Sequence, residues 1–248
     1  MRITPTDNQK MLFIVGNSRS GTTMVGRIMT GNSKIHTFNE LHFFEQLITN
    51  GDVMSRSEKS EKESEKILER LLTSSREGLF AKISYGKYKK EVEEIKKLSR
   101  STSIVDFYQT FLLYETHKQG KKIPCEQTPR YLFSLKEILE IYPNAIAINM
   151  IRDPRDICLS QKNKWRRRFL GAKNIPLAEA FRAWSNYHPW IISKLWLSSI
   201  RMAKRFENHA RFQTIRYEDL LNNPEKEIRG ICELVGVEFE REMLEITR

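Results

Sequence analysis

Cysteine is scarce in this sequence, and the three that occur, Cys125, Cys158 and Cys232, lie far apart. Their odd number and their spacing indicate neither a disulfide framework nor a cysteine-ligated metal site, so we expect packing thiols in a reducing compartment. The polar N-terminus, MRITPTDNQK, lacks the apolar core of a signal peptide. No apolar run approaches the ~20 residues of a membrane span, and the longest, Ala145–Ile151, has the length of a strand. We therefore expect a cytoplasmic protein without an integral membrane segment.

Acidic residues are outnumbered by basic ones, 31 against 42, which gives a net charge of +11 over 248 residues. Such a surplus favours an anionic partner: a nucleotide, a nucleic acid, an acidic glycan or a membrane surface. The basic residues are spread along the chain and no nucleic-acid-binding module is evident, so we expect no nucleic acid partner. The length suits one domain spanning residues 1–248.

Short apolar segments alternate with segments of helical spacing, which is typical of an α/β fold with a parallel sheet. The predicted strands are Met11–Val15, Ile35–Phe38, Ala145–Ile151 and Arg211–Tyr217. The main helices are predicted after the first strand and at Ser103–Glu115, Tyr131–Tyr142, Leu177–Arg205 (one helix or two) and Pro224–Gly236. We expect the helix at Ser103–Glu115 to be amphipathic.

The region from Gly51 to about Arg100 is dense in Ser, Glu and Lys. Such mixed charge is typical of solvated helices with i,i+4 charge pairs. We expect a disordered patch near Ser55–Ser64, and a mainly helical insertion over residues 51–115 beside the sheet.

The stretch GNSRSGTT, which follows the first predicted strand, is similar to a P-loop that has lost its lysine. A P-loop reads GxxxxGK[ST]; here Gly16 and Gly21 keep the glycine spacing, but Thr22 stands where the lysine belongs. Backbone N–H groups of the loop and of the following helix can still bind an anion, and the positive charge moves to Arg19. Transfer of a γ-phosphoryl group is disfavoured without the lysine. The motif therefore predicts an anion-binding loop that does not hydrolyse ATP.

A second informative stretch, NMIRDPRDICLS, joins a predicted strand to a helix. Arg152 lies just past the carboxyl end of the strand, and Ser160 follows eight residues later. Ligands of open α/β sheets bind at that edge, so the pair could hold a second phosphate. The alternative is an ordinary helix start with surface charges.

Together the two stretches resemble the sulfotransferases that use 3′-phosphoadenosine 5′-phosphosulfate (PAPS). RSGTT (Arg19–Thr23) is similar to the family's 5′-phosphosulfate loop, RDPRDICLS to its 3′-phosphate site, and IRYEDLLNNPEKEI (Ile215–Ile228) to its late strand–helix segment. The resemblance extends from about Phe13 to Gly236 and looks closest to the bacterial and tyrosylprotein-type branch. It implies a three-layer α/β fold, with a central parallel sheet of P-loop NTPase-like topology and a helical insertion.

The resemblance also implies an activity: sulfuryl transfer to a hydroxyl of a glycan, small metabolite or peptide, with PAPS as co-substrate and no metal. The residues that would bind the nucleotide are Arg19, Ser20, Gly21, Thr22, Thr23, Arg152, Ser160 and Tyr217. Arg19 would also stabilise the transferring group, and Glu40 matches the family's catalytic glutamate and would act as the base. His42 is the rival base; the alternatives are that Glu40 caps a helix and that His42 only packs.

The sequence departs from the family's pattern in two places. Gln127 in CEQTPR stands where relatives often carry a lysine that assists the leaving group, and Arg130 is a candidate to compensate for it. The chain stops at Arg248, where relatives continue into a basic loop over the 3′-phosphate. Either the chain is truncated or another segment, such as Trp165–Arg168, supplies that lid; the same segment could be a plain basic helix face.

Other functions stay open at this point. A P-loop kinase or hydrolase is disfavoured by Thr22, and a degenerate sulfotransferase that binds nucleotide without turnover would be consistent with Gln127. The sequence does not identify the acceptor or the oligomeric state. Aromatic residues of the predicted helices could stack on an acceptor, but at helical spacing we expect them in the core: Phe107, Tyr108, Trp184, Tyr187, Trp190 and Trp196.

Overall fold

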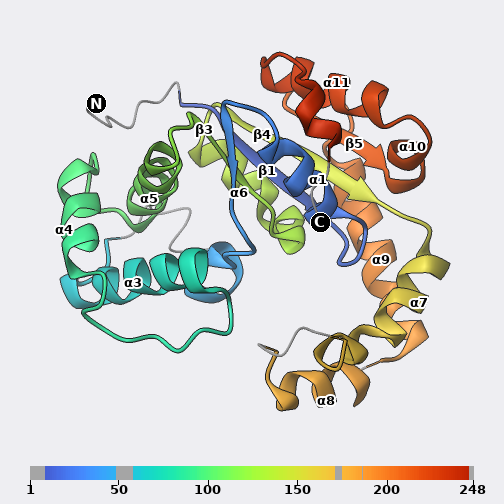
Figure 1. Ribbon diagram of the computed structural model, residues 1–248, viewed down its shortest axis with the longest axis horizontal. Helices are drawn as coiled ribbons and strands as arrows, with labels where there is room; N and C mark the ends of the chain where they lie inside the picture. Colours follow the sequence, from blue (N-terminus) through green and yellow to red (C-terminus); the bar gives the residue numbers. More distant parts are fainter. Residues whose placement is uncertain (1–8, 49–57, 171–174, 186, 246–248) are drawn as a thin grey trace.

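The computed structural model describes residues 9–48, 58–170, 175–185 and 187–245. Its centre is a five-stranded sheet in the order β2-β3-β1-β4-β5, in which every neighbouring pair is parallel (Figure 1). The strands are β1 (Met11–Gly16), β2 (Ile35–Thr37), β3 (Ile123–Glu126), β4 (Ala145–Ile151) and β5 (Phe212–Arg216). Because all five run the same way, their carboxyl ends meet at one edge. The expected α/β fold with a central parallel sheet is confirmed.

Strand β3 was absent from the sequence prediction. It lies inside the sheet, with Leu12 of β1 opposite Cys125 on one side and His36 of β2 opposite Pro124 on the other. Proline has no N–H to donate to a ladder and is uncommon inside sheets, so KKIPCE reads as a loop. The last strand is also shorter than expected, because Tyr217 begins helix α10 (Tyr217–Asn222).

Helices cover both faces of the sheet and make three layers. Side chains of β1 alternate between two buried clusters: Phe13 belongs to one and Ile14 to the other. Helices α1 (Thr22–Thr30) and α11 (Pro224–Val235) pack on the Ile14 side, and α5 (Ile104–Lys118) and α6 (Leu135–Ile141) pack on the Phe13 side. Helix α11 ends at Gly236, as expected, and this glycine has a left-handed conformation.

The expected charged helices are α3 (Glu61–Glu77) and α4 (Lys89–Leu98). Helix α3 begins at Ser60 with a capping box to Glu63, so of the disordered patch expected near 55–64 only residues 55–57 lie outside the described residues. Arg76 of α3 joins the group by donating to Glu115 of α5 at 2.6 Å and to Glu91 of α4 at 2.9 Å.

The prediction of an amphipathic helix at Ser103–Glu115 was wrong in one respect. Helix α5 is buried at every position from Ile104 to Thr116 except Asp106. It lies between the sheet on one side and α3 and α4 on the other, so its polar Gln109, Thr110 and Glu115 are buried as well.

The remaining helices are shorter or lie farther along the chain. They are the π-helix η1 (Phe43–Leu47), the 3-10 helix η2 (Pro129–Ser134), α7 (Pro154–Lys162), the 3-10 helix η3 (Lys164–Arg168), α8 (Leu177–Ser185), α9 (Pro189–Lys204) and the 3-10 helix η4 (Arg241–Leu244). The helix expected over Tyr131–Tyr142 thus begins as a 3-10 turn, and the segment 177–205 forms two helices. Within the described ranges, no helix has the length and apolarity that crossing a membrane requires.

Candidate functional site

The loop between β1 and α1 is a tight turn at the carboxyl edge of the sheet. Gly16 (φ 142°), Arg19 (φ 73°) and Gly21 (φ 97°) all have positive φ, and Gly21 is the N-cap of α1. A Cβ at Gly16 would meet the carbonyl oxygen of Met150 on β4, so only glycine lets the two strands approach this closely. The N–H of Met24 donates to the carbonyl of Gly21 at 3.0 Å, whereas those of Thr22 and Thr23 precede the first helical acceptor. Together with the helix dipole, these two N–H groups favour an anion at this end.

The structure brings the two sequence motifs together. The Nε of Arg19, in the loop, donates a hydrogen bond to the Oγ of Ser160 on α7 at 2.8 Å. Helix α7 starts directly after Arg152, with Asp153 as its N-cap and Pro154 in its first turn. The left-handed conformation at Arg19 and the course of α7 therefore bring the guanidinium of the loop to a hydroxyl in the last turn of that helix.

Tyr217 lies against the same loop. A Cβ at Gly21 would come within 2.5 Å of the Tyr217 ring, so the tyrosine packs directly on the glycine. The guanidinium of Arg152 lies 4.2 Å from the centroid of that ring. Arg152 also pairs with Asp156 at 3.2 Å, and its carbonyl oxygen accepts a hydrogen bond from the indole of Trp196 at 3.0 Å. Asp156 and Trp196 had no place in the sequence prediction of the site. The i,i+4 spacing of Arg152 and Asp156 could have indicated their pair, whereas no spacing links Trp196 to Arg152.

Two polar atoms around the loop lack a hydrogen-bond partner that a ligand could supply. The Oγ of Ser20 and the Nε of Arg152 are buried and have no hydrogen-bond partner among the described residues. A buried polar group without a partner is costly, and a bound anion is one way to satisfy it. Thr22 is buried while Thr23, the next residue of α1, is exposed. A helix N-terminus, two arginines and unsatisfied donors fit a ligand that carries phosphate or sulfate groups.

A second group of ionisable residues follows β2, at the same edge of the sheet. The Nε2 of His42 lies 3.2 Å from Glu40, and its Nδ1 lies 3.4 Å from Glu45. Burial lowers the pKa of His42, but the hydrogen bonds and charges of the two carboxylates outweigh it and raise the pKa to about 9. His42 is therefore a cation at neutral pH. Its side chain is 13% exposed and that of Glu40 is 40% exposed, so the carboxylate of Glu40 is the accessible member.

A buried carboxylate that the sequence analysis missed holds this turn in place. Glu126, at the end of β3, accepts hydrogen bonds from the backbone N–H groups of Leu41 (3.0 Å) and Thr128 (2.9 Å) and from the Thr128 hydroxyl (2.5 Å). Burial raises the pKa of Glu126 to about 7, against the lowering effect of these donors. The only sequence signal was its place at the end of a strand, and that strand was itself not recognised.

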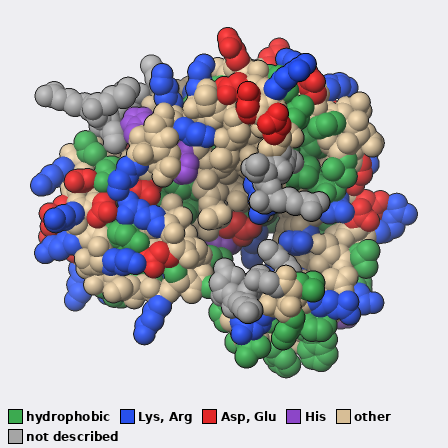
Figure 2. Space-filling model, viewed as in Figure 1, with side chains coloured by type: hydrophobic (Ala, Val, Ile, Leu, Met, Phe, Trp, Pro, Cys, Tyr) green, Lys and Arg blue, Asp and Glu red, His purple; other side chains and the backbone are tan. Residues whose placement is uncertain are grey.

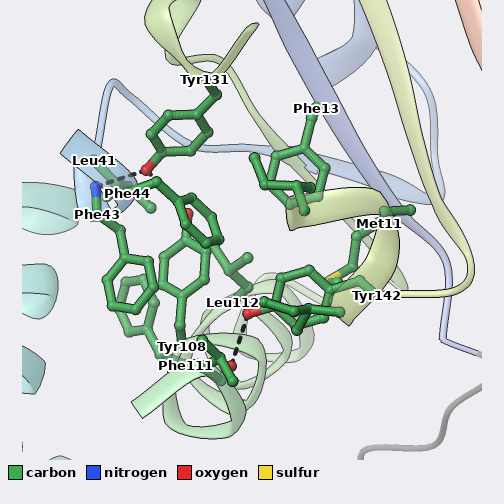
Figure 3. Close-up of a cluster of buried hydrophobic side chains, with 14 of the residues drawn as sticks. Met11, Phe13, Leu41, Phe43, Phe44, Tyr108, Phe111, Leu112, Tyr131 and Tyr142 are labelled. Carbon is green, nitrogen blue, oxygen red and sulfur yellow. Dashed lines mark hydrogen bonds between the residues drawn. The ribbon is translucent and has the colours of Figure 1, made fainter. Parts of the chain in front are cut away.

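An aromatic cluster lies beneath the turn (Figure 3). Phe43 stacks on Tyr108 with ring centroids 3.9 Å apart, and its backbone N–H donates to the hydroxyl of Tyr131 at 2.6 Å. The hydroxyl of Tyr142 donates to the carbonyl of Val105 at 2.8 Å and ties α5 to the same cluster. The Glu40–Glu45 segment is thus fixed from below by rings and hydroxyl groups, and His42 has a left-handed backbone (φ 54°).

Gln127 and Arg130, the two residues of CEQTPR considered in place of the family's lysine, lie in different surroundings. Gln127 is buried beside α1: a Cβ at Gly26 would lie 2.8 Å from its Oε1. The Nε of Arg130 lies 3.7 Å from Glu45, and its side chain is 71% exposed. Arg130 therefore contributes positive charge near the Glu40–His42–Glu45 group. The described residues contain no group of three or more His, Cys, Asp or Glu arranged to hold a metal ion.

Aromatic residues expected in the core divide into three sets, of which one, Tyr187 and Trp196, is half-buried. Phe107 and Tyr108 of α5 are buried, as expected. Trp184 of α8 and Trp190 of α9 are 58% and 65% exposed, so the prediction was wrong for them. Helical spacing identifies a common face, but it does not say whether another element covers that face.

Comparisons with known proteins identify the family and the fold. The family model described as the sulfotransferase family matches residues 12–241. Sulfotransferase 2A1 of Macaca fascicularis is 23% identical over 143 residues, which cover 53% of this chain and 47% of that enzyme. The match thus spans about half of that relative's length.

Two solved structures share the fold. The sulfotransferase domain of the olefin synthase from Synechococcus PCC 7002 matches with a TM-score of 0.60 and 19% identity, over 100% of this chain and 80% of that one. The sulfotransferase domain from the curacin biosynthetic pathway matches with a TM-score of 0.61 and 17% identity, over 97% and 78%.

Proposed function

The chain belongs to the sulfotransferase family, and from that premise we propose that it transfers a sulfuryl group from PAPS to a hydroxyl acceptor. The observation that carries the proposal is the contact between Arg19 and Ser160. It joins the loop to the last turn of α7, the helix that begins directly after Arg152, so the two motifs that would bind the phosphate groups of one ligand lie side by side. Without a lysine at Thr22, the same loop is poorly suited to a kinase or a hydrolase.

The nucleotide would lie along the carboxyl edge between the two motifs. The N–H groups of Thr22 and Thr23 and the hydroxyl of Ser20 would bind the 5′-phosphate side. Arg152 and Ser160 would bind the 3′-phosphate, and Tyr217, which lies against Gly21 and Arg152, would contact the adenine. When bound, PAPS supplies the sulfuryl group, and Arg19 would stabilise the negative charge that collects on the leaving phosphate.

Glu40 is the better candidate for the base. A base must be unprotonated and reachable, and Glu40 is the more exposed partner of its pair with His42. His42, with a pKa of about 9, already carries its proton at neutral pH. We therefore assign Glu40 to take the proton of the acceptor hydroxyl, and His42 to hold the Glu40 carboxylate. The transfer then relies on positive side chains and backbone amides in place of a metal.

The wider setting of the activity also belongs to the proposal. We propose one sulfotransferase domain over residues 1–248, in which the helices of the 51–115 region pack against the sheet through α5. On cysteine usage we propose a cytoplasmic site of action. The acceptor class stays at a hydroxyl compound: a glycan, a small metabolite or a peptide.

Calorimetric titration with 3′-phosphoadenosine 5′-phosphate tests the nucleotide site. We expect micromolar binding by the wild type, a loss of at least about tenfold in Arg19→Ala and in Arg152→Ala, and weak binding of ATP with Mg²⁺. Arg229→Ala, which removes an arginine paired with Glu225 on α11, is the matched control and should bind as the wild type does. Equal affinity in all four proteins, or tighter binding of ATP with Mg²⁺, would contradict the proposal.

A further inference from the structure

An exposed hydrophobic surface covers the part of the molecule built by η3, α8 and the start of α9. Most of the large hydrophobic side chains that are exposed among the described residues lie between 159 and 195. The six that define this surface, called the apolar face below, are each more than half exposed: Phe169, Leu170, Leu177, Phe181, Trp184 and Trp190. In Figure 2 hydrophobic side chains gather at the lower end of the molecule, where Figure 1 places α8.

Ring contacts and helix packing join most of the apolar face. On α8, Leu177, Phe181 and Trp184 follow one another at helical spacing, and the last two rings lie 5.7 Å apart. Helix α8 packs against η3, where the Trp165 and Phe169 rings lie 5.9 Å apart. Single exposed hydrophobic residues are ordinary, but a contiguous patch of this kind marks an interaction surface.

The charged residues around the apolar face are mainly positive. Between Leu159 and Trp196 the sequence holds eight Lys and Arg against a single acidic residue, Glu179, a net charge of 8 − 1 = +7. Glu179 is itself paired with Arg182 at 2.7 Å. The ammonium of Lys194 lies over the Trp190 ring at 5.2 Å from its centroid, so cations border the hydrophobic side chains directly.

The hydrophobic and basic residues of the apolar face indicate which kind of partner it binds. Phe, Leu and Trp side chains next to Lys and Arg are what interfacial helices present to a bilayer, where the rings enter the headgroup region and the cations bind anionic lipids. A second copy of this chain would bring two segments of +7 together, which like-charge repulsion opposes. We propose that the apolar face docks the protein on the surface of an anionic lipid bilayer. The inference is independent of the sulfotransferase reaction.

Vesicle co-sedimentation tests the proposal with the whole chain. We expect binding to phosphatidylcholine vesicles that contain phosphatidylserine, little binding to phosphatidylcholine alone, and weakening of at least about fivefold in high salt as the charges are screened. The double variant Phe181→Ser/Trp184→Ser should bind at least about tenfold more weakly. The matched control, Phe80→Ser/Leu221→Ser, removes two exposed hydrophobic residues outside the apolar face and should bind as the wild type does.

A second variant and one further measurement keep the test decisive. Arg166→Ala/Lys194→Ala removes two positive charges and leaves every hydrophobic residue of the apolar face in place. It should weaken binding only to the anionic vesicles. Absence of binding to anionic vesicles by the wild type, or equal binding by all variants, would overturn the proposal. It would also be overturned if light scattering showed a dimer that Phe181→Ser/Trp184→Ser dissociates, because the apolar face would then be a contact between copies.

Discussion

Arg19 and Ser160 are 141 residues apart in sequence and are joined by a hydrogen bond of 2.8 Å from the arginine Nε to the serine Oγ. The bond links the loop after β1 to the helix after β4, two neighbouring strands of the sheet. A guanidinium fixed by a neutral hydroxyl keeps its full charge, which suits a group that must bind an anion. The contact thus couples the positions of the two halves of the proposed nucleotide site.

Removing the serine hydroxyl should loosen Arg19. Ser160→Ala is expected to weaken the binding of 3′-phosphoadenosine 5′-phosphate by about three- to tenfold, the worth of one hydrogen bond. Titration calorimetry measures it, with Ser199→Ala on α9 as the control, because the hydroxyl of Ser199 only donates to the carbonyl of Leu195 in its own helix. An unchanged affinity in Ser160→Ala would show that Arg19 is positioned by other contacts.

Gly16 should be the residue of the loop that stability depends on most. In Gly16→Ala the new methyl group meets the Met150 carbonyl at a φ of 142°, so we expect a loss of about 2 kcal/mol or more in the free energy of unfolding. Gly86→Ala is the control, since Gly86 also has positive φ (88°) but has open space around it. Urea unfolding of both variants separates the clash from the backbone strain; equal losses would mean that the β1–β4 approach is not the cause.

The sequence predicted the loop and the helix start of the site, but not the residues that hold them in place. The spacing of Gly16 and Gly21 indicates the loop, and Asp153 and Pro154 indicate the helix start after Arg152, because local backbone chemistry favours these residues there. Glu126 and Trp196 act through contacts made across the sheet edge, with Leu41 and Arg152, and no local pattern encodes such partners.

The fold shows the same limit. Strand β3 was not predicted because Pro124 lies inside it. The sheet accommodates this proline, but in a sequence a proline usually indicates that no strand continues through it. Helix α5 looked amphipathic because Gln109 and Glu115 are polar, whereas α3 and α4 bury that side too. Trp184 and Trp190 looked like core residues because they are aromatic, and only the tertiary structure shows that nothing among the described residues covers them.

The ionised His42 should stabilise the fold below alkaline pH. Its pKa is raised to about 9 in the folded protein, above the usual 6.5, so the stabilisation is complete below about pH 6.5 and is lost as the pH rises through 9. We expect His42→Asn to cost on the order of 1–3 kcal/mol at pH 6 and much less at pH 10. The charged groups that act on the imidazole are Glu40, Glu45 and Glu126, and Arg130 lies beside Glu45.

Urea unfolding of the wild type and His42→Asn at both pH values measures this difference. His209→Asn serves as the control, because His209 lies in the turn before β5, away from the carboxylates. A deficit of His42→Asn that stays constant from pH 6 to 10 would show that the imidazole acts by packing alone.

Glu126 should act on stability over a different range of pH. Burial raises its pKa to about 7 from the usual 4.5, so the folded protein favours the protonated form. This contribution is complete below about pH 4.5 and is lost as the pH rises through 7. In Glu126→Gln the side chain cannot ionise, so the decline between these pH values should be smaller than in the wild type. Glu137→Gln on α6 is the control, and parallel curves for all three proteins would contradict a raised pKa at Glu126.

Glu40→Gln separates binding from chemistry at the proposed site. The amide keeps the shape of the side chain but cannot take a proton, so we expect kcat to fall by about 10²- to 10⁴-fold. The affinity for 3′-phosphoadenosine 5′-phosphate should stay within about twofold, because the nucleotide is assigned to Arg19, Arg152 and their neighbours. Sulfuryl transfer from PAPS to a panel of phenols, sugars and tyrosyl peptides first identifies an acceptor with which turnover can be followed.

Glu45→Gln is the matched control for that experiment, since Glu45 pairs with His42 from the other side and its side chain is only 15% exposed. Removing it lowers the pKa of His42 but leaves the Glu40 carboxylate in place, so kcat should fall far less than in Glu40→Gln. If Glu45→Gln were the more damaging change, His42 would be the residue whose charge matters to the reaction. If Glu40→Gln turned over as the wild type does, the base would have to be sought elsewhere along the carboxyl edge.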